Sequence, residues 1–112
     1  MDTNGLTSQR VKVVLRRFHP QTPREIIRGI VTAVDEAGLR VSGRRFQEHS
    51  DLETAVLTER PVEADNAVYW IPYSSIRYTE IIAPGSASEK LDNEIQRHKV
   101  FTPQELHRPT VS

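Results

Sequence analysis

Residues 22–47, TPREIIRGIVTAVDEAGLRVSGRRFQ, decide the fold, because their pattern fits either one helix or two strands. The run Thr22-Pro23-Arg24-Glu25 matches a helix N-terminus, with a capping threonine, a proline in the first turn and a glutamate that closes the capping box. The apolar residues from Ile26 to Val34 then fall on one helical face. This alternative predicts an α+β protein with a helix over about residues 23–37.

Two features of the same stretch favour strands. Nearly all of its apolar residues are β-branched, and Gly29 lies in the middle of the proposed helix, where glycine is unfavourable. Asp35-Glu36-Ala37-Gly38 also fits a hairpin loop with glycine at the left-handed position. The residues from Leu39 onward then alternate between apolar and polar. We therefore predict two strands, over about residues 26–35 and 38–47.

Three other segments read as strands of the same domain. Residues 11–18 alternate in period two, residues 67–71 are aromatic and β-branched, and residues 76–82 resume after a break at Pro72. Between them, residues 48–66 are predicted to form a long connecting segment, either a loop or two extended edge segments. The sequence thus predicts a mainly β domain over residues 11–83.

The two ends of the chain are expected to lie outside this domain. Residues 1–10 are polar and are predicted to be disordered. Residues 84–112 are predicted to form a helical or flexible tail. A capping box at Ser86-Ala87-Ser88-Glu89 begins a helix of about three turns, and Thr102 begins a short helical turn.

Composition excludes several classes of protein. The chain has 112 residues, a mean hydropathy of −0.52 and no cysteine, so disulfides and cysteine-based metal or redox sites are absent. No apolar run approaches the roughly 20 residues that a membrane span needs. The first ten residues contain no apolar stretch typical of a signal peptide. These observations lead us to expect a cytoplasmic protein.

Charge is unevenly distributed although 15 basic and 15 acidic residues cancel. Residues 1–28 carry six bases and two acids, whereas residues 47–67 carry six acids and one base. A basic first third could attract an anionic partner. Alternatively, the basic and acidic segments lie close together and neutralise each other.

One short motif resembles that of a known family. Gly29-x-Val31-x-x-Val34-Asp35 is similar to the first motif of the Sm-like family, which includes the Sm and LSm proteins and Hfq. In that family the glycine lets the second strand bend, the two apolar residues face the core and the aspartate supports the following loop. Residues 71–76, IPYSSI, occupy the place of the second motif. The resemblance covers about residues 11–82 and implies a small, strongly bent, five-stranded β-barrel.

The resemblance also implies a function. Members of the family form rings, here expected to contain about five to seven copies, and bind single-stranded RNA through the loops after the second and fourth strands. The usual RNA-contacting residues are mostly not matched: Leu39 stands where the Sm branch has asparagine, and Pro72-Tyr73-Ser74 replaces the Arg-Gly or Lys-His pair. We therefore expect a non-enzymatic, ring-forming protein that binds RNA. The alternative is a scaffold or protein-interaction module on the same barrel without RNA binding.

Two sets of residues are candidates for these roles. Arginines at strand ends beside Phe18 and Phe46, together with polar residues after the break at Pro72, are the types that bind single-stranded RNA. The arginines could instead pair with the acids of residues 48–65. Aromatic and aliphatic residues of the last two strands would pair neighbouring subunits. The predicted RNA-binding residues are Arg16, Arg17, Arg44, Tyr73, Ser74 and Arg77, and the predicted interface residues are Tyr69, Ile71, Ile76, Tyr78 and Ile81.

Catalytic and metal-binding signatures are missing from the sequence. The four histidines are scattered and none has the spacing of a helical metal site. Ser74-Ser75 lacks a nucleophile elbow, and no glycine-rich loop could cradle a phosphate. We therefore expect no enzymatic activity, no metal and no cofactor.

Overall fold

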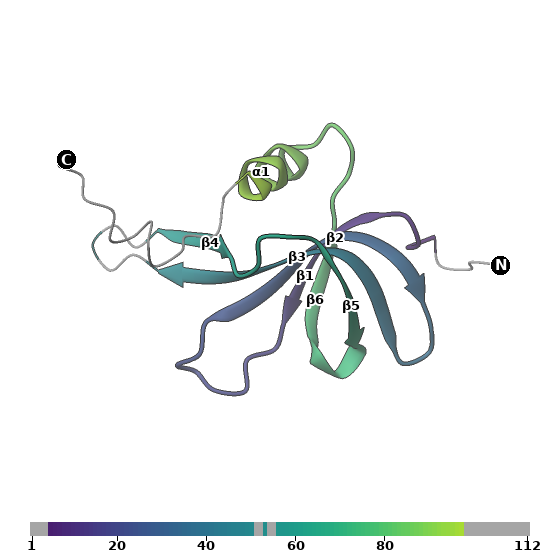
Figure 1. Cartoon of the computed structure of the whole chain (residues 1–112), viewed down its shortest axis with the longest axis horizontal. Helices are drawn as coiled ribbons and strands as arrows, with labels where there is room; N and C mark the ends of the chain where they lie inside the picture. The colour runs from purple at the N-terminus through teal and green to yellow at the C-terminus, as the bar shows by residue number, and fades with distance from the viewer. Residues whose placement is uncertain (1–4, 51–52, 54–55, 98–112) are drawn as a thin grey trace.

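The computed structural model describes residues 5–50, 53 and 56–97, and it is mainly β with one short α-helix (Figure 1). The predicted mainly β class with a C-terminal helix is therefore confirmed. The predicted helical turn at Thr102 lies outside the described residues. The elements are β1 (Arg10–Leu15), β2 (Arg24–Val34), β3 (Gly38–Ser50), β4 (Leu57–Pro61), β5 (Ala67–Pro72), a 3-10 turn η1 (Tyr73–Ser75), β6 (Ile76–Ile81) and α1 (Ala87–Gln96).

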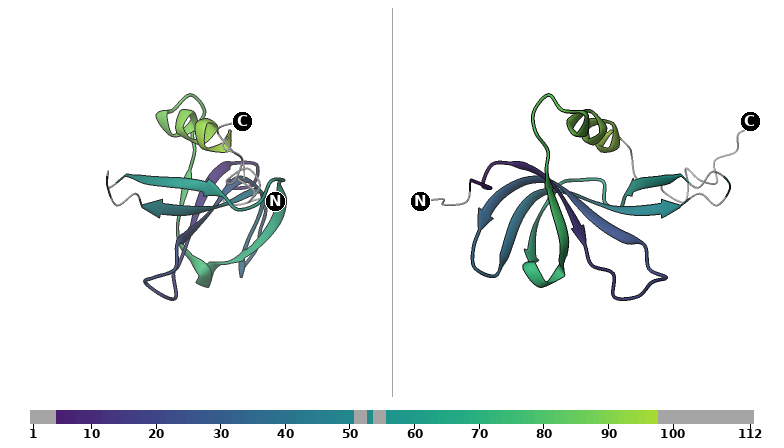
Figure 2. Two further views of the ribbon diagram at one scale, coloured as in Figure 1. Left: turned by 60° about the vertical axis from the view of Figure 1, so that its left-hand side comes forward. Right: turned by 180° about the vertical axis from the view of Figure 1, so that it is seen from behind.

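The six strands form one antiparallel sheet in the order β4-β3-β2-β1-β6, with β5 also paired to β3. The long strand β3 pairs with two strands along its length: residues 38–43 pair with β5, and residues 46–50 pair with β4. The sheet curls, and η1 connects β5 to β6 without a ladder between these strands in the described residues (Figure 2). The β3–β4 hairpin projects from one side of the curled sheet (Figure 1).

The alternative of a helix over residues 23–37 is wrong. Residues 24–34 form β2, which pairs with β1 on one side and β3 on the other. A central strand buried between two neighbours suits the β-branched run that disfavours the helix. Asp35 stabilises the following loop, because its Oδ1 accepts hydrogen bonds from the N–H groups of Ala37 (2.7 Å) and Gly38 (3.1 Å).

The acidic connecting segment contains two edge segments. β3 continues to Ser50, three residues beyond its predicted end, and β4 pairs with it from Phe46↔Pro61 to Ser50↔Leu57. Residues 6–9 also differ from the disorder predicted for the first ten residues. Ser8 N–H donates to the Val31 carbonyl (2.7 Å), and Leu6 packs against the core.

Alternation along the strands creates two apolar clusters on opposite faces of the sheet. Odd-numbered residues of β1 and β3, and those of β2 as far as its irregularity after Val31, point into the concave face. This inner cluster consists of Val11, Val13, Ile27, Val31, Leu39, Val41 and Ile71. The outer cluster consists of Val14, Ile26 and Phe46, covered by Ile95 of α1. The helix therefore completes a second, smaller core.

Two glycines face each other on the paired strands β2 and β3. Gly29 and Gly43 are register partners. A Cβ on Gly29 would lie 2.7 Å from the Gly43 Cα, and a Cβ on Gly43 would lie 2.6 Å from the Gly29 Cα. No real Cβ approaches another carbon atom so closely, so these positions accept only glycine without a backbone shift. The sheet bends at this close approach.

A buried charge cluster fixes α1 to the outer face. Arg28 of β2 is 2% exposed and donates to both carboxylate oxygens of Glu59 (2.8 Å each) and to Asp92 of α1 (2.8 Å). Asp92, 1% exposed, also forms an ion pair with Arg10. Burial opposes the charge of Arg28, but hydrogen bonds and attraction from Glu59 and Asp92 outweigh it and raise the pKa above its ordinary value.

Candidate nucleic-acid interface

The β1–β2 loop, residues 16–23, lies beside the start of β6. Arg16 N–H donates to the Ser75 carbonyl (2.9 Å), and the Arg16 Nε donates to the Ile76 carbonyl (3.2 Å). Within the loop, the Thr22 hydroxyl donates to the His19 carbonyl (2.8 Å) and closes a turn. This conformation leaves the Phe18 ring 82% exposed. Aromatic and cationic side chains therefore meet where β1 ends and β6 begins.

Four arginines and one aromatic ring line a single cleft of about 430 Å³. The lining residues are Arg16, Arg17, Phe18, Arg24 and Arg77, and we call this surface the arginine cleft. No acidic residue of the described ranges lines it. Among the residues that the structure describes, none of its four arginines forms an ion pair with a carboxylate. The arginine cleft is therefore a site of uncompensated positive charge.

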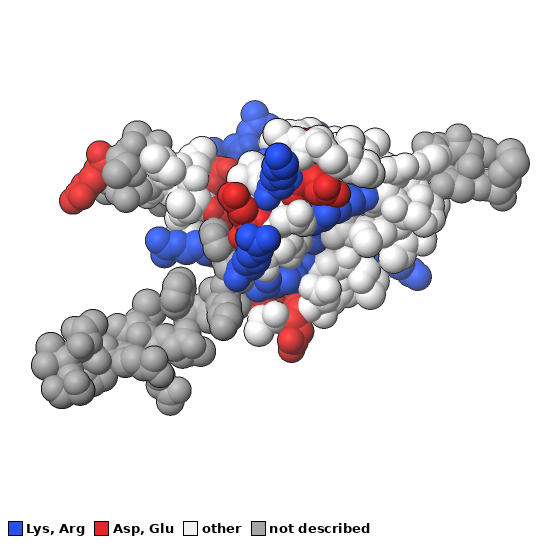
Figure 3. All heavy atoms as spheres, turned by 90° about the horizontal axis from the view of Figure 1, so that it is seen from above, with Lys and Arg blue, Asp and Glu red and all other residues white. Residues whose placement is uncertain are grey.

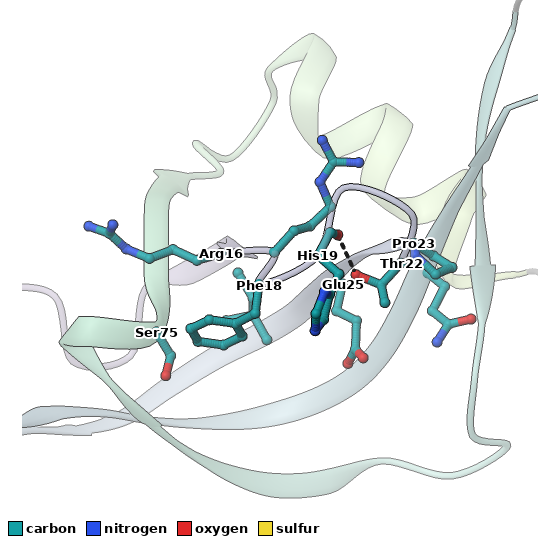
Figure 4. Close-up of a pocket in the computed structure, with 10 residues that line it drawn as sticks. Arg16, Phe18, His19, Thr22, Pro23, Glu25 and Ser75 are labelled. Carbon is teal, nitrogen blue, oxygen red and sulfur yellow. Dashed lines mark hydrogen bonds between the residues drawn. The ribbon is translucent and has the colours of Figure 1, made fainter.

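A second pocket of about 440 Å³ adjoins the arginine cleft and shares Arg16, Arg17 and Phe18 with it. Figure 4 shows Phe18, His19 and Glu25 projecting to the same side of the loop, while the guanidinium group of Arg16 extends away from them. Glu25 is anchored by Arg45, whose NH1 lies 3.2 Å from its Oε1. We call this hollow the polar pocket. The remaining residues that line it are Leu15, Thr22, Pro23, Gln47 and Ser75.

The structure brings together only half of the predicted RNA-binding set. Arg16, Arg17 and Arg77 lie in the arginine cleft. Arg44 does not, because it projects from the outer face of β3 toward α1. It donates to the carbonyl groups of Gln96 (2.9 Å) and Glu63 (3.2 Å). It therefore lies outside the arginine cleft, since the alternation of β3 turns it to the face that α1 covers.

Tyr73 and Ser74 lie in η1 and do not line the arginine cleft. The Tyr73 hydroxyl donates to the Asp35 carbonyl (2.7 Å), and the Tyr73 N–H donates to the Ala37 carbonyl (2.9 Å). Tyr73 therefore ties η1 to the β2–β3 loop. Sequence reasoning missed Arg24, which it placed in a helix cap. Its position at the first residue of a strand that follows the arginine-rich loop could have indicated its role.

The predicted interface residues divide between core and surface. Ile71 belongs to the inner cluster, and Tyr69 and Ile76 pack against it. The side chains of these three residues therefore pack within the subunit. Burial, followed by the negative charge of Glu63, raises the Tyr69 pKa. Tyr78 and Ile81 of β6 are about half exposed, at 47% and 53%.

β5 offers two exposed apolar residues that the interface prediction did not contain. Trp70 is 47% exposed and Val68 is 65% exposed, both on the outer face. They alternate with Tyr69 and Ile71, which face inward. Alternation requires that one of Tyr69 and Trp70 faces outward, and the register with β3 decides which.

The charge asymmetry of the sequence is partly neutralised in the fold. Arg28 from the basic first third pairs with Glu59 from the acidic middle, at 2.8 Å. Arg45 lies 3.4 Å from Glu63. On the face that carries α1, basic and acidic side chains are intermixed (Figure 3). The arginines of the cleft belong to the basic residues that these pairs leave uncompensated.

Among the described residues, no group of three or more histidine and acidic side chains is placed to hold a metal ion. The same part of the chain contains no helix long and apolar enough to cross a membrane. Comparison of the chain with models of protein families, with curated proteins and with solved structures finds no match.

Proposed function

We propose that this protein binds single-stranded RNA through the arginine cleft, without catalysing a reaction. The observation that carries this proposal is the convergence of Arg16, Arg17, Arg24 and Arg77 with the exposed ring of Phe18 in a cleft that no carboxylate lines within the described part of the chain. The resemblance of residues 29–35 to the first Sm-like motif supports RNA as the ligand. The cleft lies on a different set of loop residues from those that the resemblance implies.

The chemistry of the cleft suits a single strand better than a duplex. Guanidinium groups bind phosphate oxygens through paired, charge-assisted hydrogen bonds. An exposed aromatic ring stacks on a base whose faces are free, which occurs in single strands and loops. Because the Phe18 ring is 82% exposed, such a base would cover apolar surface that is now in contact with water.

Removal of cleft arginines is expected to weaken RNA binding and to reduce its salt dependence. Arg24→Ala and Arg77→Ala should each lower affinity for a single-stranded oligonucleotide about tenfold, as expected for the loss of a charged hydrogen bond. Each should also reduce the slope of log affinity against log salt by about 0.7 if one phosphate contact is lost. Fluorescence anisotropy across a salt series measures both quantities.

Arg40→Ala is the matched control for this experiment. Arg40 is an exposed arginine of β3 that lines neither the arginine cleft nor the polar pocket. Its replacement removes the same charge and should leave the slope of log affinity against log salt concentration nearly unchanged. Equal losses for Arg24→Ala, Arg77→Ala and Arg40→Ala would contradict the proposal, because they would indicate attraction to overall charge and not to the cleft.

We also propose that copies of the chain assemble through the free edges of β5 and β6. Ile82 N–H donates to the Arg10 carbonyl, so alternation directs the backbone groups of Thr79 and Ile81 away from β1. The same reasoning directs the backbone groups of Val68 and Trp70 away from β3. The β5 edge of one copy can pair with the β6 edge of the next. A closed ring of about five to seven copies then gives every such edge a hydrogen-bonding partner.

A charge on the β6 edge is expected to prevent this assembly. Ile81→Lys places a cation on an exposed edge residue, where lysine opposes pairing with another strand. Light scattering should report a multimer for the unmodified protein and a monomer for the variant. Ile30→Lys, on the central strand β2 at similar exposure, should remain multimeric. A monomeric unmodified protein would contradict the assembly proposal. Ile81 is chosen over Ile76 because the Ile76 side chain packs against the core, so a charge there would also affect folding.

A further inference from the structure

The polar pocket has the composition of a site for one flat, hydrogen-bonding group. Its volume of about 440 Å³ lies in the range of small-molecule sites. Leu15, Phe18 and Pro23 supply apolar walls, while Glu25, Gln47 and other polar residues supply hydrogen-bonding groups. Because it shares Arg16, Arg17 and Phe18 with the arginine cleft, a group held in the polar pocket would be continuous with phosphates in the cleft.

Two strands present the hydrogen-bonding groups side by side. Glu25 of β2 and Gln47 of β3 are direct register partners, so their side chains emerge on the same face. Arg45 holds one carboxylate oxygen of Glu25, its Oε1, at 3.2 Å. Within the described part of the chain, the second oxygen, Oε2, has no hydrogen-bond partner. The pocket therefore contains an oriented acceptor beside a side-chain amide, which can both donate and accept.

We propose that the polar pocket selects an unpaired guanine, whose Watson–Crick edge faces Glu25 while neighbouring phosphates occupy the arginine cleft. This inference rests on the proposed RNA binding. Guanine alone among the four RNA bases presents two adjacent donors, N1–H and the N2 amino group, on that edge. A carboxylate accepts both, and the Gln47 amide can donate to the adjacent O6.

The other bases fit this arrangement less well. Uracil places a carbonyl oxygen on each side of its single N–H donor, and both oxygens would face the negative carboxylate. Cytosine and adenine each place one amino donor beside an acceptor nitrogen. Each of them therefore leaves one oxygen of the Glu25 carboxylate unpaired or opposed to a lone pair, which is costly in a partly enclosed site.

A comparison of short oligonucleotides tests the inference separately from RNA binding itself. A uridine hexamer measures binding through the arginine cleft and Phe18. The same hexamer with one internal guanosine should bind about tenfold more tightly, the effect of one well-placed pair of hydrogen bonds. Replacement of that guanosine by inosine, which lacks the N2 amino group, should remove most of the gain. Fluorescence anisotropy at one salt concentration measures all three affinities.

Variants of the pocket residues test whether the preference for guanosine arises in the polar pocket. Glu25→Ala should abolish the gain from guanosine but still bind the uridine hexamer. Because this change also removes a negative charge, Glu36→Ala is the matched control: Glu36 is exposed in the β2–β3 loop and lines neither site. Gln47→Ala leaves the Glu25–Arg45 pair in place and should reduce the gain, so the test does not depend on one variant.

The possible results are distinguishable. Tight binding of all three oligonucleotides with equal affinity would overturn the guanine pocket and leave RNA binding intact. A preference for guanosine that survives both Glu25→Ala and Gln47→Ala would overturn the assignment to this pocket. Failure of every oligonucleotide to bind would overturn the proposed function and the guanine pocket together.

Discussion

The Gly43→Ala variant is expected to lose about 3 kcal/mol or more of its free energy of unfolding, the upper end for overpacked positions. A methyl group at this position would meet the Arg28 carbonyl and lie 2.6 Å from the Gly29 Cα. Both obstacles are backbone atoms of the paired strand, so no side-chain rotation can relieve the contact. The two central strands would have to separate locally, and urea denaturation followed by far-UV circular dichroism measures the loss.

Ser42→Ala provides the comparison for this variant. Ser42 is adjacent on the same strand, and alanine at that position removes a hydroxyl group without adding volume. Its expected cost is within about 1 kcal/mol. Similar stability of Gly43→Ala and the unmodified protein would show that β2 and β3 do not require their close approach.

Arg28→Met is expected to destabilise the protein by about 3 kcal/mol, because it leaves carboxylates in the outer core without their central partner. Asp92 is 1% exposed and, among the described residues, keeps only Arg10 as a cationic partner, while Glu59 loses both of its hydrogen bonds to Arg28. The docking of α1 should weaken first, since Asp92 belongs to that helix. Urea denaturation measures the global loss, and amide hydrogen exchange in residues 87–96 measures the local one.

Two further variants separate charge burial from simple loss of an arginine. Arg45→Met removes two ion pairs, with Glu25 and Glu63, whose side chains are at least one-third exposed, so it should cost less than Arg28→Met, about 1 kcal/mol. The triple variant Arg28→Met, Glu59→Leu, Asp92→Leu removes the buried charges together and should recover most of the stability. A triple variant less stable than Arg28→Met alone would contradict this account.

The hairpin of β2 and β3 could be predicted because several local signals agree. The β-branched run before Asp35 and the alternation after Gly38 each favour strands, and the loop residues between them suit a tight connection. The ends of the strands could not be predicted, because β3 extends to Ser50 only by pairing with β4. That pairing is a tertiary contact, and residues 48–50 carry no strong intrinsic preference for a strand.

The candidate site was predictable in part for a similar reason. Period-two alternation shows that neighbouring arginines point to opposite faces, but it does not show which face another element covers. Arg44 turns toward α1, whereas Arg77 turns toward the β1–β2 loop. Arg24 and Arg77 are far apart in the chain and meet because β1 lies between β2 and β6. Only the strand order brings their guanidinium groups to one cleft.

The position of β1 between β2 and β6 also constrains how the chain folds during synthesis. The β2–β3 hairpin needs only local contacts and can close early. The other edge of β1 cannot pair until β6 has been synthesised. Arg28 likewise cannot bind Asp92, which follows it by 64 residues, until that residue has been synthesised. Until then, β1 exposes unpaired backbone groups and part of the outer cluster is uncovered. Aggregation of nascent chains should therefore be most severe when synthesis stalls between residues 50 and 76.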